Sequence, residues 1–432
     1  MAKTIGIGLI GLGTVGSGVV QLLRNAPSAM RRRKNVGFEL RGIAVRDVGR
    51  QRSVDFDHSL LTADGMAVVD DPGVEMVVEL TGASPAVEWV RAALKKGKDV
   101  VTANKAMLAD YGEELYELAL ENGADLMFEA SVAGGIPIIR SLRNGLVANR
   151  VESLYGILNG TTNYILTQMT RGAGDYADIL ELAQEKGFAE PDPTMDVSGM
   201  DAAQKLSILC RIAFHSGSTG SQIFCEGIEK IERRDIEYAG ELGYVIKLLA
   251  IAKKRGDRVE ARVHPAMVPA DSLLANIHDE FNAIEVVGSA VGEQVFYGRG
   301  AGQMPTASAV VSDMVYLAER KMAGAGPAIG DMVLGSDAVS IGDIAESEIR
   351  YFLRMQVLDR PGVMEQIAHV LAVEGISIAS VIQKERDLQG GSVPLVIDTH
   401  EAREQGMQRA VRAINDLEVV EDEVHLIRME EL

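Results

Sequence analysis

The feature that most constrains the fold is a glycine pattern directly after a short apolar run near the N-terminus. Residues 4–10 (TIGIGLI) are typical of a buried strand, GLGTVG follows at 11–16, and apolar residues then recur at helical spacing. In such a strand–turn–helix unit, Gly11 permits a tight turn, Gly13 lets the backbone approach a pyrophosphate, and Gly16 lets the helix pack closely on the sheet. The free N–H groups of the helix then face the phosphates. The pattern predicts a dinucleotide site, and a glycine-rich turn that binds nothing is the alternative.

Strand-like and helix-like segments continue to alternate through the first third of the chain. Apolar runs bounded by turn-forming residues lie at 39–45, 75–80, 99–105 and 126–130. Amphipathic helical stretches separate the later runs. This alternation predicts βαβ units and therefore an α/β fold, a Rossmann-type doubly wound parallel sheet with helices on both faces. We assign residues 1–133 to this dinucleotide-binding domain.

A second region, 134–302, mixes amphipathic helices with longer strand-like runs, and we expect an α+β substrate and dimerisation domain. Its expected strands are 150–158, 244–254, 258–268 and 283–298. A helical segment at 306–317, within a return segment near 303–322, is expected to pack back on the first domain. Residues 323–348 are rich in Gly, Ala, Ser and Asp and are interpreted as a linker.

The last stretch, 349–432, is typical of a small βαββαβ domain. Its expected elements are a strand at 351–359, a helix at 361–375, strands at 376–383 and 392–400, a helix at 401–415 and a strand at 419–429. Pro361 suits the first turn of the first of these helices.

Composition excludes several classes of function. The chain has 43 Lys and Arg against 62 Asp and Glu, a net charge of −19. So acidic a surface repels phosphate backbones and anionic lipids, and we expect neither a nucleic-acid nor a membrane partner. Two cysteines are too few for a disulfide framework or a thiolate metal site, and no apolar run is long enough to span a bilayer. The N-terminus lacks a signal-peptide cleavage pattern, so we expect a cytoplasmic protein.

The end of the second strand bears on the choice of dinucleotide. Arg46 and Asp47 follow Val45 there. An acidic residue at this strand end usually binds the ribose diol of NAD, whereas an arginine accommodates the 2′-phosphate of NADP. Arg46 occupies the nearer position and favours NADP, while Asp47 leaves NAD open. A solvated loop arginine is the alternative.

Two lysines are the best candidates for the proton transfer that accompanies hydride transfer. Lys105 follows a strand at the carboxyl edge of the sheet, where open α/β sheets bind ligands. Lys205 precedes a strongly apolar helical run, and burial there can lower the pKa of a lysine toward neutrality. Asp201 lies one helical turn before Lys205, and the upstream carboxylates Glu190 and Asp196 suit an ammonium group. An exposed i, i+4 ion pair beside an acidic loop is the alternative.

Residues 183–205 (AQEKGFAEPDPTMDVSGMDAAQK) resemble, without a gap, the signature of homoserine dehydrogenases. Further motifs occur in that family's order: GLGTVG at 11–16, TANK at 102–105, EASVAGGIPII at 129–139 and NGTTNYIL at 159–166. The resemblance covers about residues 1–320. It implies NAD(P)-dependent interconversion of L-aspartate 4-semialdehyde and L-homoserine, on the route to threonine and methionine.

The resemblance also implies roles for individual residues. Lys205 is similar to the family's proton donor to the aldehyde oxygen, and Lys105 to a lysine near the reacting hydroxyl and the nicotinamide. Candidate substrate contacts are Glu190, Asp201, Asp196 and Thr161. Candidate cofactor contacts are Gly11, Gly13, Thr14, Val15, Gly16, Arg46, Lys105, Gly187 and Gly302. A sodium site of the family is matched by Glu129, Val132, Gly134 and Ile136, where mostly backbone oxygens suit a hard cation.

The C-terminal unit resembles an ACT domain, an amino-acid-sensing module, through LDRPGV at 358–363 and GISI at 375–378. Small ligands of such domains contact the strand-to-helix turn, here around Asp359 and Gly362. Attached to an enzyme of threonine synthesis, the module implies feedback regulation by L-threonine. A dimerisation module without a ligand is the alternative.

Three other assignments compete with this one. A phosphorylating semialdehyde dehydrogenase needs an activated cysteine, but Cys210 lies in an apolar helical run and Cys225 has no nearby histidine pattern. A non-catalytic dinucleotide or amino-acid sensor would not need two lysines beside carboxylates. A fusion with an aspartate kinase needs a long segment before the first strand, so we expect a stand-alone dehydrogenase. From the family we also expect a homo-oligomer, a dimer or a tetramer.

Overall fold

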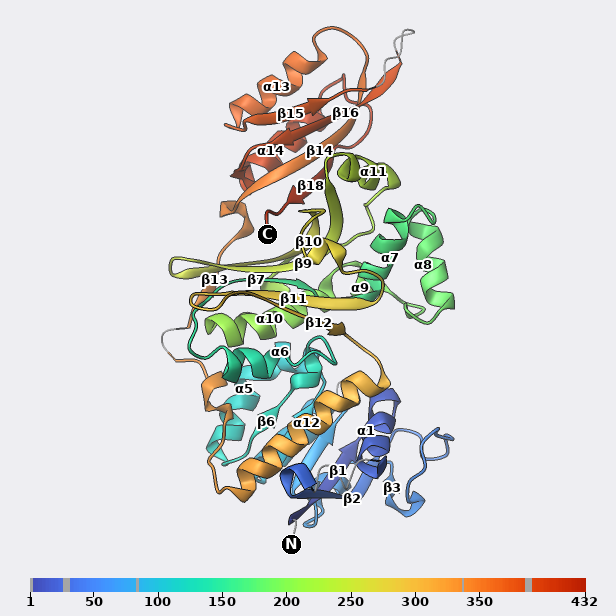
Figure 1. Cartoon of the computed structure of the whole chain (residues 1–432), viewed down its shortest axis with the longest axis vertical. Coiled ribbons are helices and arrows are strands. Elements are labelled where there is room, and N and C mark those ends of the chain that lie inside the picture. Colours follow the sequence, from blue (N-terminus) through green and yellow to red (C-terminus); the bar gives the residue numbers. More distant parts are fainter. Residues whose placement is uncertain (1–2, 26–31, 83–84, 336–337, 385–390) are drawn as a thin grey trace. The chain divides into compact units, whose positions relative to one another are not determined.

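The computed structural model describes residues 3–25, 32–82, 85–335, 338–384 and 391–432. The chain divides into two compact units, each built from three separate segments (Figure 1). Unit 1 comprises Met1–Gly160, Asp201–Ile223 and Glu280–Ser340. Unit 2 comprises Thr161–Met200, Phe224–Asp279 and Ile341–Leu432.

Unit 1 contains a parallel sheet whose strand order is β3-β2-β1-β4-β5-β6. The strands are β1 (Lys3–Ile10), β2 (Val36–Ala44), β3 (Leu61–Thr62), β4 (Met76–Glu79), β5 (Asp99–Thr102) and β6 (Leu126–Met127). The progression of the chain across the sheet reverses at β1, which pairs with β2 on one side and β4 on the other. Successive residues of β1 and β4 are buried irrespective of the face they occupy, as in a sheet covered by helices on both faces. The predicted doubly wound α/β fold is confirmed.

Helices cover this sheet, and one of them comes from far along the chain. The helices are α1 (Thr14–Asn25), α3 (Gly65–Asp70), α4 (Ala86–Lys95), α5 (Lys105–Glu121) and α12 (Gln303–Met322). Figure 1 shows α12 in orange beside α1 in blue. A Cβ at Gly18 of α1 would lie 2.9 Å from the Cβ of Ala307, so the glycine allows the two helices to approach closely. Helix α12 therefore packs against α1, although the two helices lie far apart in the sequence.

Unit 1 also holds three antiparallel strands in the order β12-β11-β7. They are β7 (Val151–Ile157), β11 (Phe281–Gly288) and β12 (Gly292–Arg299). The prediction of a single strand over 283–298 is wrong, because residues 289–291 turn the chain back and Gly292, with a φ of 72°, begins the second strand of a hairpin. The predicted strand over 126–130 ends at Met127, and Glu129–Ser131 form a buried 3-10 turn instead.

Unit 2 is organised around a mixed sheet with the strand order β9-β10-β18-β14-β16-β15. The strands are β9 (Tyr244–Arg255), β10 (Arg258–Pro269), β14 (Glu348–Leu358), β15 (Ile378–Ile382), β16 (Ser392–Thr399) and β18 (His425–Met429). The helices are α7 (Gly160–Thr170), α8 (Tyr176–Glu185), α9 (Thr194–Val197), α11 (Arg233–Glu241), α13 (Val363–Val373) and α14 (Glu404–Asn415). β18 pairs in parallel with β10 and antiparallel with β14, so the C-terminal module continues the sheet that begins with β9.

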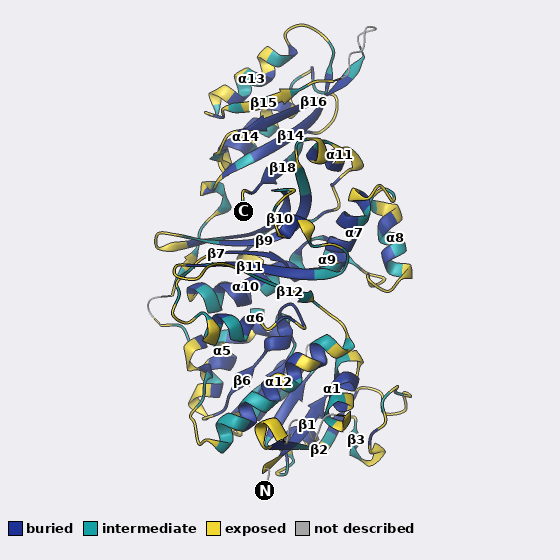
Figure 2. Cartoon of the chain, in the orientation of Figure 1, coloured by how far each residue is buried: buried dark blue, intermediate teal, exposed yellow. Residues whose placement is uncertain are grey.

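The C-terminal module has the predicted βαββαβ order, β14-α13-β15-β16-α14-β18, with a two-residue strand β17 (Ala402–Arg403) before α14. Figure 2 shows β14 and β16 largely buried, whereas β15 and one face of α13 are partly exposed. The segment interpreted as a linker contains short 3-10 turns at Ile329–Met332 and Ile344–Glu346; Ser336 and Asp337 lie outside the described residues. Among the described helices, none combines the length and the apolar character needed to cross a bilayer.

Candidate functional site

The turn after β1 has the geometry that its glycines permit. Gly11 has a φ of 102°, and its N–H donates to the carbonyl oxygen of Ala44 (2.9 Å). A Cβ at Gly16 would lie 2.2 Å from the carbonyl oxygen of Gly11, so only a glycine lets α1 approach the turn this closely. A Cβ at Gly13 would meet no described atom within 4 Å, which leaves the turn open beside the start of α1 at Thr14. This open backbone at a helix N-terminus suits a pyrophosphate.

The loop after β2 leaves one of its two candidate side chains available. The Asp47 carboxylate accepts the N–H of Gly49 (2.9 Å), and the Asp47 carbonyl oxygen accepts a hydrogen bond from Arg52 (2.7 Å). Arg46 is exposed and makes no hydrogen bond or ion pair within the described part of the chain. Its guanidinium is therefore available to an anionic group.

Gly187 and Gly302, the other candidate cofactor glycines, occupy positions that disfavour side chains. Gly187 follows α8 with a φ of 74°, and Gly302 precedes α12 with a φ of 119°. A Cβ at Gly187 would meet no described atom within 4 Å, and one at Gly302 would approach Pro305 no closer than 3.5 Å. In each case the backbone conformation, rather than crowding, is what favours glycine.

A buried polar chain fixes the start of α5, where Lys105 is the first residue. The Thr102 hydroxyl donates to the carboxylate of Glu79 (2.7 Å) and accepts the N–H of Asn104 (3.0 Å). The Asn104 side chain in turn accepts the N–H of Met107 (3.1 Å), which caps the helix. Sequence reasoning missed Glu79, although a carboxylate at the end of an apolar strand was the available signal.

Helices α5 and α10 (Met200–Phe214) bring two lysines to one carboxylate. Lys105 Nζ lies 3.1 Å from Asp201 Oδ1, and Lys205 Nζ lies 2.7 Å from Asp201 Oδ2. Lys205 also donates to the carbonyl oxygen of Leu158 (2.7 Å). Asn159 Nδ2 donates to Asp201 Oδ2 (2.8 Å), a contact that the NGTTNYIL motif contained but that sequence reasoning did not assign.

The charges in this cluster are held in place by burial. The side chains of Asp201 and Lys205 are only 8% and 13% exposed, so they do not form the exposed ion pair that was the alternative. Burial would raise the pKa of Asp201, but the ammonium groups of Lys205 and Lys105 and the bonds to Lys205 and Asn159 lower it to about 2. Asp201 is therefore ionised at neutral pH, and its carboxylate pairs with the Nζ atoms of both lysines.

The remaining candidate substrate contacts lie in unit 2, Thr161 in α7 and Glu190 and Asp196 in the segment between α8 and α10. The Thr161 hydroxyl lies 2.7 Å from the carbonyl oxygen of Phe188 and 3.0 Å from Asp196 Oδ2, so it can donate its proton to either. Glu190 is exposed. The structure thus brings Thr161 and Asp196 together and leaves the Glu190 carboxylate accessible to solvent.

In the segment after β6, the carboxylate of Glu129 accepts hydrogen bonds from the backbone of the protein. Glu129 accepts the N–H groups of Ile139 (2.8 Å) and Arg140 (2.9 Å), at the start of the short helix α6 (Ile138–Arg140). Burial, followed by the nearby charge of Asp313, raises the pKa of Glu129 to about 7. Asp313 accepts the backbone N–H of Glu129 (2.8 Å) and a guanidinium bond from Arg140 (2.6 Å).

The backbone of the same segment offers oxygens to a cation. Ala133 and Gly134 have φ values of 51° and 41°, which turn the chain sharply. The residues Glu129, Val132 and Gly134 are buried, and their carbonyl oxygens accept no hydrogen bond from any described residue. The carbonyl oxygen of Ile136, in contrast, accepts the N–H of Ile138 (2.8 Å). Buried carbonyl oxygens without donors fit a hard cation.

The two cysteines are unsuited to nucleophilic chemistry. Burial raises the pKa of Cys210 to about 12 and, with smaller contributions from Glu229 and Glu226, raises the pKa of Cys225 to about 11. The Cys225 thiol donates to the carbonyl oxygen of Ser198 (3.1 Å). Both thiols therefore stay protonated at neutral pH, which disfavours the phosphorylating dehydrogenase.

The candidate effector residues lie at the turn between β14 and α13. Gly362 has a φ of 90° and directly precedes α13, and the N–H of Asp359 donates to the carbonyl oxygen of Gly391 (3.0 Å). The turn thus ends in an exposed helix N-terminus.

Three family models match the chain. The model described as homoserine dehydrogenase, NAD binding domain, matches residues 11–129, that described as homoserine dehydrogenase matches 137–315, and that described as ACT domain matches 351–419. Homoserine dehydrogenase of Pseudomonas aeruginosa is 42% identical over 434 residues, which cover 100% of both chains. Homoserine dehydrogenase of Bacillus subtilis is 40% identical over 433 residues, which cover 99% of both.

Solved structures agree with these matches. A homoserine dehydrogenase from Thiobacillus denitrificans is 41% identical, with a TM-score of 0.92 over 99% of both chains. A hyperthermophilic archaeal homoserine dehydrogenase in complex with NADPH is 26% identical, with a TM-score of 0.62 over 73% of this chain and 98% of the other.

Proposed function

The chain belongs to the homoserine dehydrogenase family, and from that premise we propose that it interconverts L-homoserine and L-aspartate 4-semialdehyde with a nicotinamide dinucleotide. The observation that carries the proposal is the cluster of Lys105, Asp201 and Lys205, in which the side chains of Asp201 and Lys205 are 8% and 13% exposed. It places two ammonium groups at the carboxyl edge of the sheet, where doubly wound folds bind their ligands. The direct test is the assay of purified protein with L-homoserine and each dinucleotide.

In the reducing direction, the residues of the cluster supply the proton. The dinucleotide, when bound, supplies a hydride to the aldehyde carbon. Lys205 donates a proton from Nζ to the aldehyde oxygen, and the neutral amine regains a proton from solvent. Asp201 holds both lysines in place, since each of its carboxylate oxygens contacts the Nζ of one lysine. Lys105 stabilises negative charge that develops on the same oxygen.

The amino-acid part of the substrate is held by other groups. Glu190 and Asp196 supply carboxylates for the substrate ammonium, and Thr161 contributes a hydroxyl. The exposure of Glu190 supports this role, because a carboxylate that is not engaged inside the protein is available to a ligand.

Arg46 selects NADP through the 2′-phosphate. Replacing Arg46 with alanine is expected to raise KM for NADP about tenfold or more, the effect of losing one charge-assisted bond, and to leave KM for NAD nearly unchanged. Steady-state kinetics with both dinucleotides checks this. Equal effects on both cofactors would contradict the assignment of Arg46.

The carbonyl oxygens of Glu129, Val132 and Gly134 would hold a sodium ion, with Ile136 as a fourth candidate. Such an ion would be coordinated by backbone oxygens that accept no hydrogen bond from the described residues. The rate of homoserine oxidation is expected to be higher in sodium chloride than in tetramethylammonium chloride of equal ionic strength. A rate that is independent of the cation would contradict the sodium site.

The C-terminal module senses L-threonine at the turn of Asp359 and Gly362. L-Threonine is expected to inhibit turnover at concentrations where D-threonine has no effect, because backbone groups of this turn would recognise the ammonium and carboxylate in one handedness. Initial rates with each enantiomer check this. Inhibition by neither would leave the module with a structural role.

A further inference from the structure

A lysine in the middle of β9 has no place in the site described above. Lys247 lies within the apolar run YVIKLLAIAKK and is 1% exposed. No described carboxylate lies within ion-pair distance of its ammonium group, which is unusual for a buried lysine. Burial lowers the pKa of Lys247 to about 8, with the charge of Asp279 opposing the shift and that of Arg171 adding to it.

The ammonium group of Lys247 donates hydrogen bonds to two neutral oxygens. Its Nζ donates to Asn163 Oδ1 (3.1 Å) and to the carbonyl oxygen of Ile277. Asn163 belongs to α7, and its own Nδ2 donates to the carbonyl oxygens of Ile277 (3.2 Å) and Asp279 (3.0 Å). The ammonium group therefore orients an amide whose other end ties α7 to residues 277–279.

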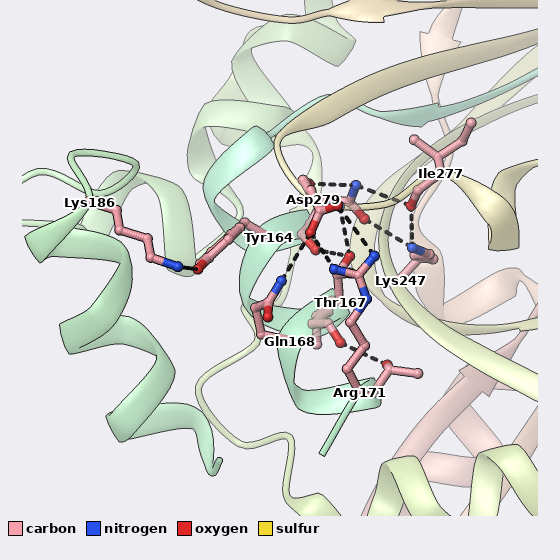
Figure 3. Close-up of polar contacts among 11 residues, drawn as sticks. Tyr164, Thr167, Gln168, Arg171, Lys186, Lys247, Ile277 and Asp279 are labelled. Carbon is pink, nitrogen blue, oxygen red and sulfur yellow. Dashed lines mark hydrogen bonds and ion pairs between the residues drawn. The ribbon is translucent and has the colours of Figure 1, made fainter. Parts of the chain in front are cut away.

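Asp279 extends this connection along α7 (Figure 3). Its backbone has a φ of 57°, a conformation that a residue other than glycine rarely adopts. Its N–H donates to the Thr167 hydroxyl (3.1 Å), and its carboxylate accepts bonds from Gln168 (3.0 Å) and Arg171 (2.8 Å). Because these partners take up the carboxylate, Lys247 relies on Asn163 and Ile277.

The opposite end of α7 holds the loop that carries the candidate substrate residues. Thr161 bonds to Phe188 and Asp196, as described above. Tyr164 accepts a hydrogen bond from Lys186 (3.0 Å), and its ring lies 4.9 Å from that of Phe188. The first turn of α7 therefore contacts the loop from Lys186 to Asp196, and Asn163 lies in that turn.

We propose that Lys247 is a positioning residue for substrate binding, which acts by fixing Asn163 and thereby the turn of α7 that holds the loop of Gly187, Glu190 and Asp196. Lys247 itself does not touch the reacting atoms. The inference rests on the proposed function in one respect, that this loop binds the substrate. A buried ammonium group is destabilising unless hydrogen bonds compensate for its lost hydration. The Nζ of Lys247 makes these hydrogen bonds to the side-chain amide of Asn163 and the carbonyl oxygen of Ile277.

The test combines two substitutions. Replacing Lys247 with methionine keeps an unbranched side chain one atom shorter and removes the donor. The substitution is expected to raise KM for L-homoserine about tenfold with little change in kcat, the order expected for one lost bond to a charged group. In an Asn163→Ala background, Lys247→Met is expected to raise KM no further. If Lys247→Met raised KM by the same factor in the wild-type and the Asn163→Ala backgrounds, the proposal would be overturned, because Lys247 would then act independently of Asn163.

A second measurement does not depend on activity. Amide hydrogen exchange of residues 186–196 is expected to be faster in Lys247→Met than in the wild type. Unchanged exchange would overturn the proposal even if the wild type turned over no homoserine, whereas inactivity of the wild type alone would contradict only the proposed function. Should Lys247→Met fail to fold, Lys247→Gln, which retains an amide donor, is expected to show the same changes to a smaller degree.

Lys253 provides the matched control on the same strand. Its ammonium group pairs with Glu430 (2.6 Å), and its side chain is 16% exposed. Lys253→Met is expected to lower stability without changing KM or the exchange of 186–196. If it produced the same changes as Lys247→Met, a general weakening of β9 would explain both and the proposal would fall.

Discussion

Replacing Lys205 with methionine is expected to lower kcat by about 10²–10⁴-fold, the usual contribution of one general acid–base group. The loss follows from the position of Lys205, whose side chain is 13% exposed and whose Nζ donates to the Asp201 carboxylate and the Leu158 carbonyl oxygen. Affinity for the dinucleotide is expected to stay within about twofold, since the candidate pyrophosphate contacts Gly11, Gly13 and Gly16 lie at the turn after β1. Steady-state kinetics and a cofactor titration measure the two quantities.

Lys205→Arg distinguishes proton donation from simple charge. Arginine keeps the positive charge beside Asp201 but does not release a proton at neutral pH. It is therefore expected to lose about as much kcat as methionine does. If Lys205→Arg retained most of the activity, the ammonium of Lys205 would act as an electrostatic group and the assignment of the proton donor would be wrong.

Replacing Asp201 with asparagine is expected to lower the free energy of unfolding by about 3–5 kcal/mol, the effect of breaking a buried ion pair. Two ammonium groups would then face each other without the carboxylate that now separates them. Urea unfolding of wild type and variant measures the difference. Glu319→Gln is the control, because the Lys34–Glu319 pair is 51% and 36% exposed and such pairs contribute about 0–1 kcal/mol.

The difference in the free energy of unfolding between the wild type and Asp201→Asn is expected to depend on pH. The pKa of Asp201 is about 2 in the folded chain against an ordinary value of 3.8, so the stabilisation is complete above about pH 4 and is lost as the pH falls toward 2. The gap between wild type and Asp201→Asn should therefore be constant near neutrality and narrow only in acid. A gap that widened on acidification would contradict the assigned charge of Asp201.

The parallel sheet could be predicted from sequence because its signals are local. The apolar run before Gly11 and the helical spacing after Gly16 specify β1, the turn and α1 without reference to distant residues. The C-terminal βαββαβ order was equally visible. The hairpin over 281–299 was not predicted, although Gly288 and Gly292 around its turn were a usable signal.

The candidate site depends on contacts that spacing does not encode. The i, i+4 spacing predicts the contact of Asp201 with Lys205, but neither its burial nor the bond from Lys105 on another helix. Asn159 and Glu79 were missed because their partners lie far along the chain. Lys247 offered one sign, a lysine inside an apolar strand, but its partner Asn163 could be identified only from the fold.

The most direct measurement is the change in nicotinamide absorbance when the purified full-length protein is given L-homoserine with NADP and then with NAD in sodium-containing buffer. We expect reduction of the dinucleotide that requires L-homoserine, produces one equivalent of the semialdehyde and is lost in Lys205→Met. No reduction with either dinucleotide would contradict the proposed activity and would favour a protein that binds these ligands without turning them over.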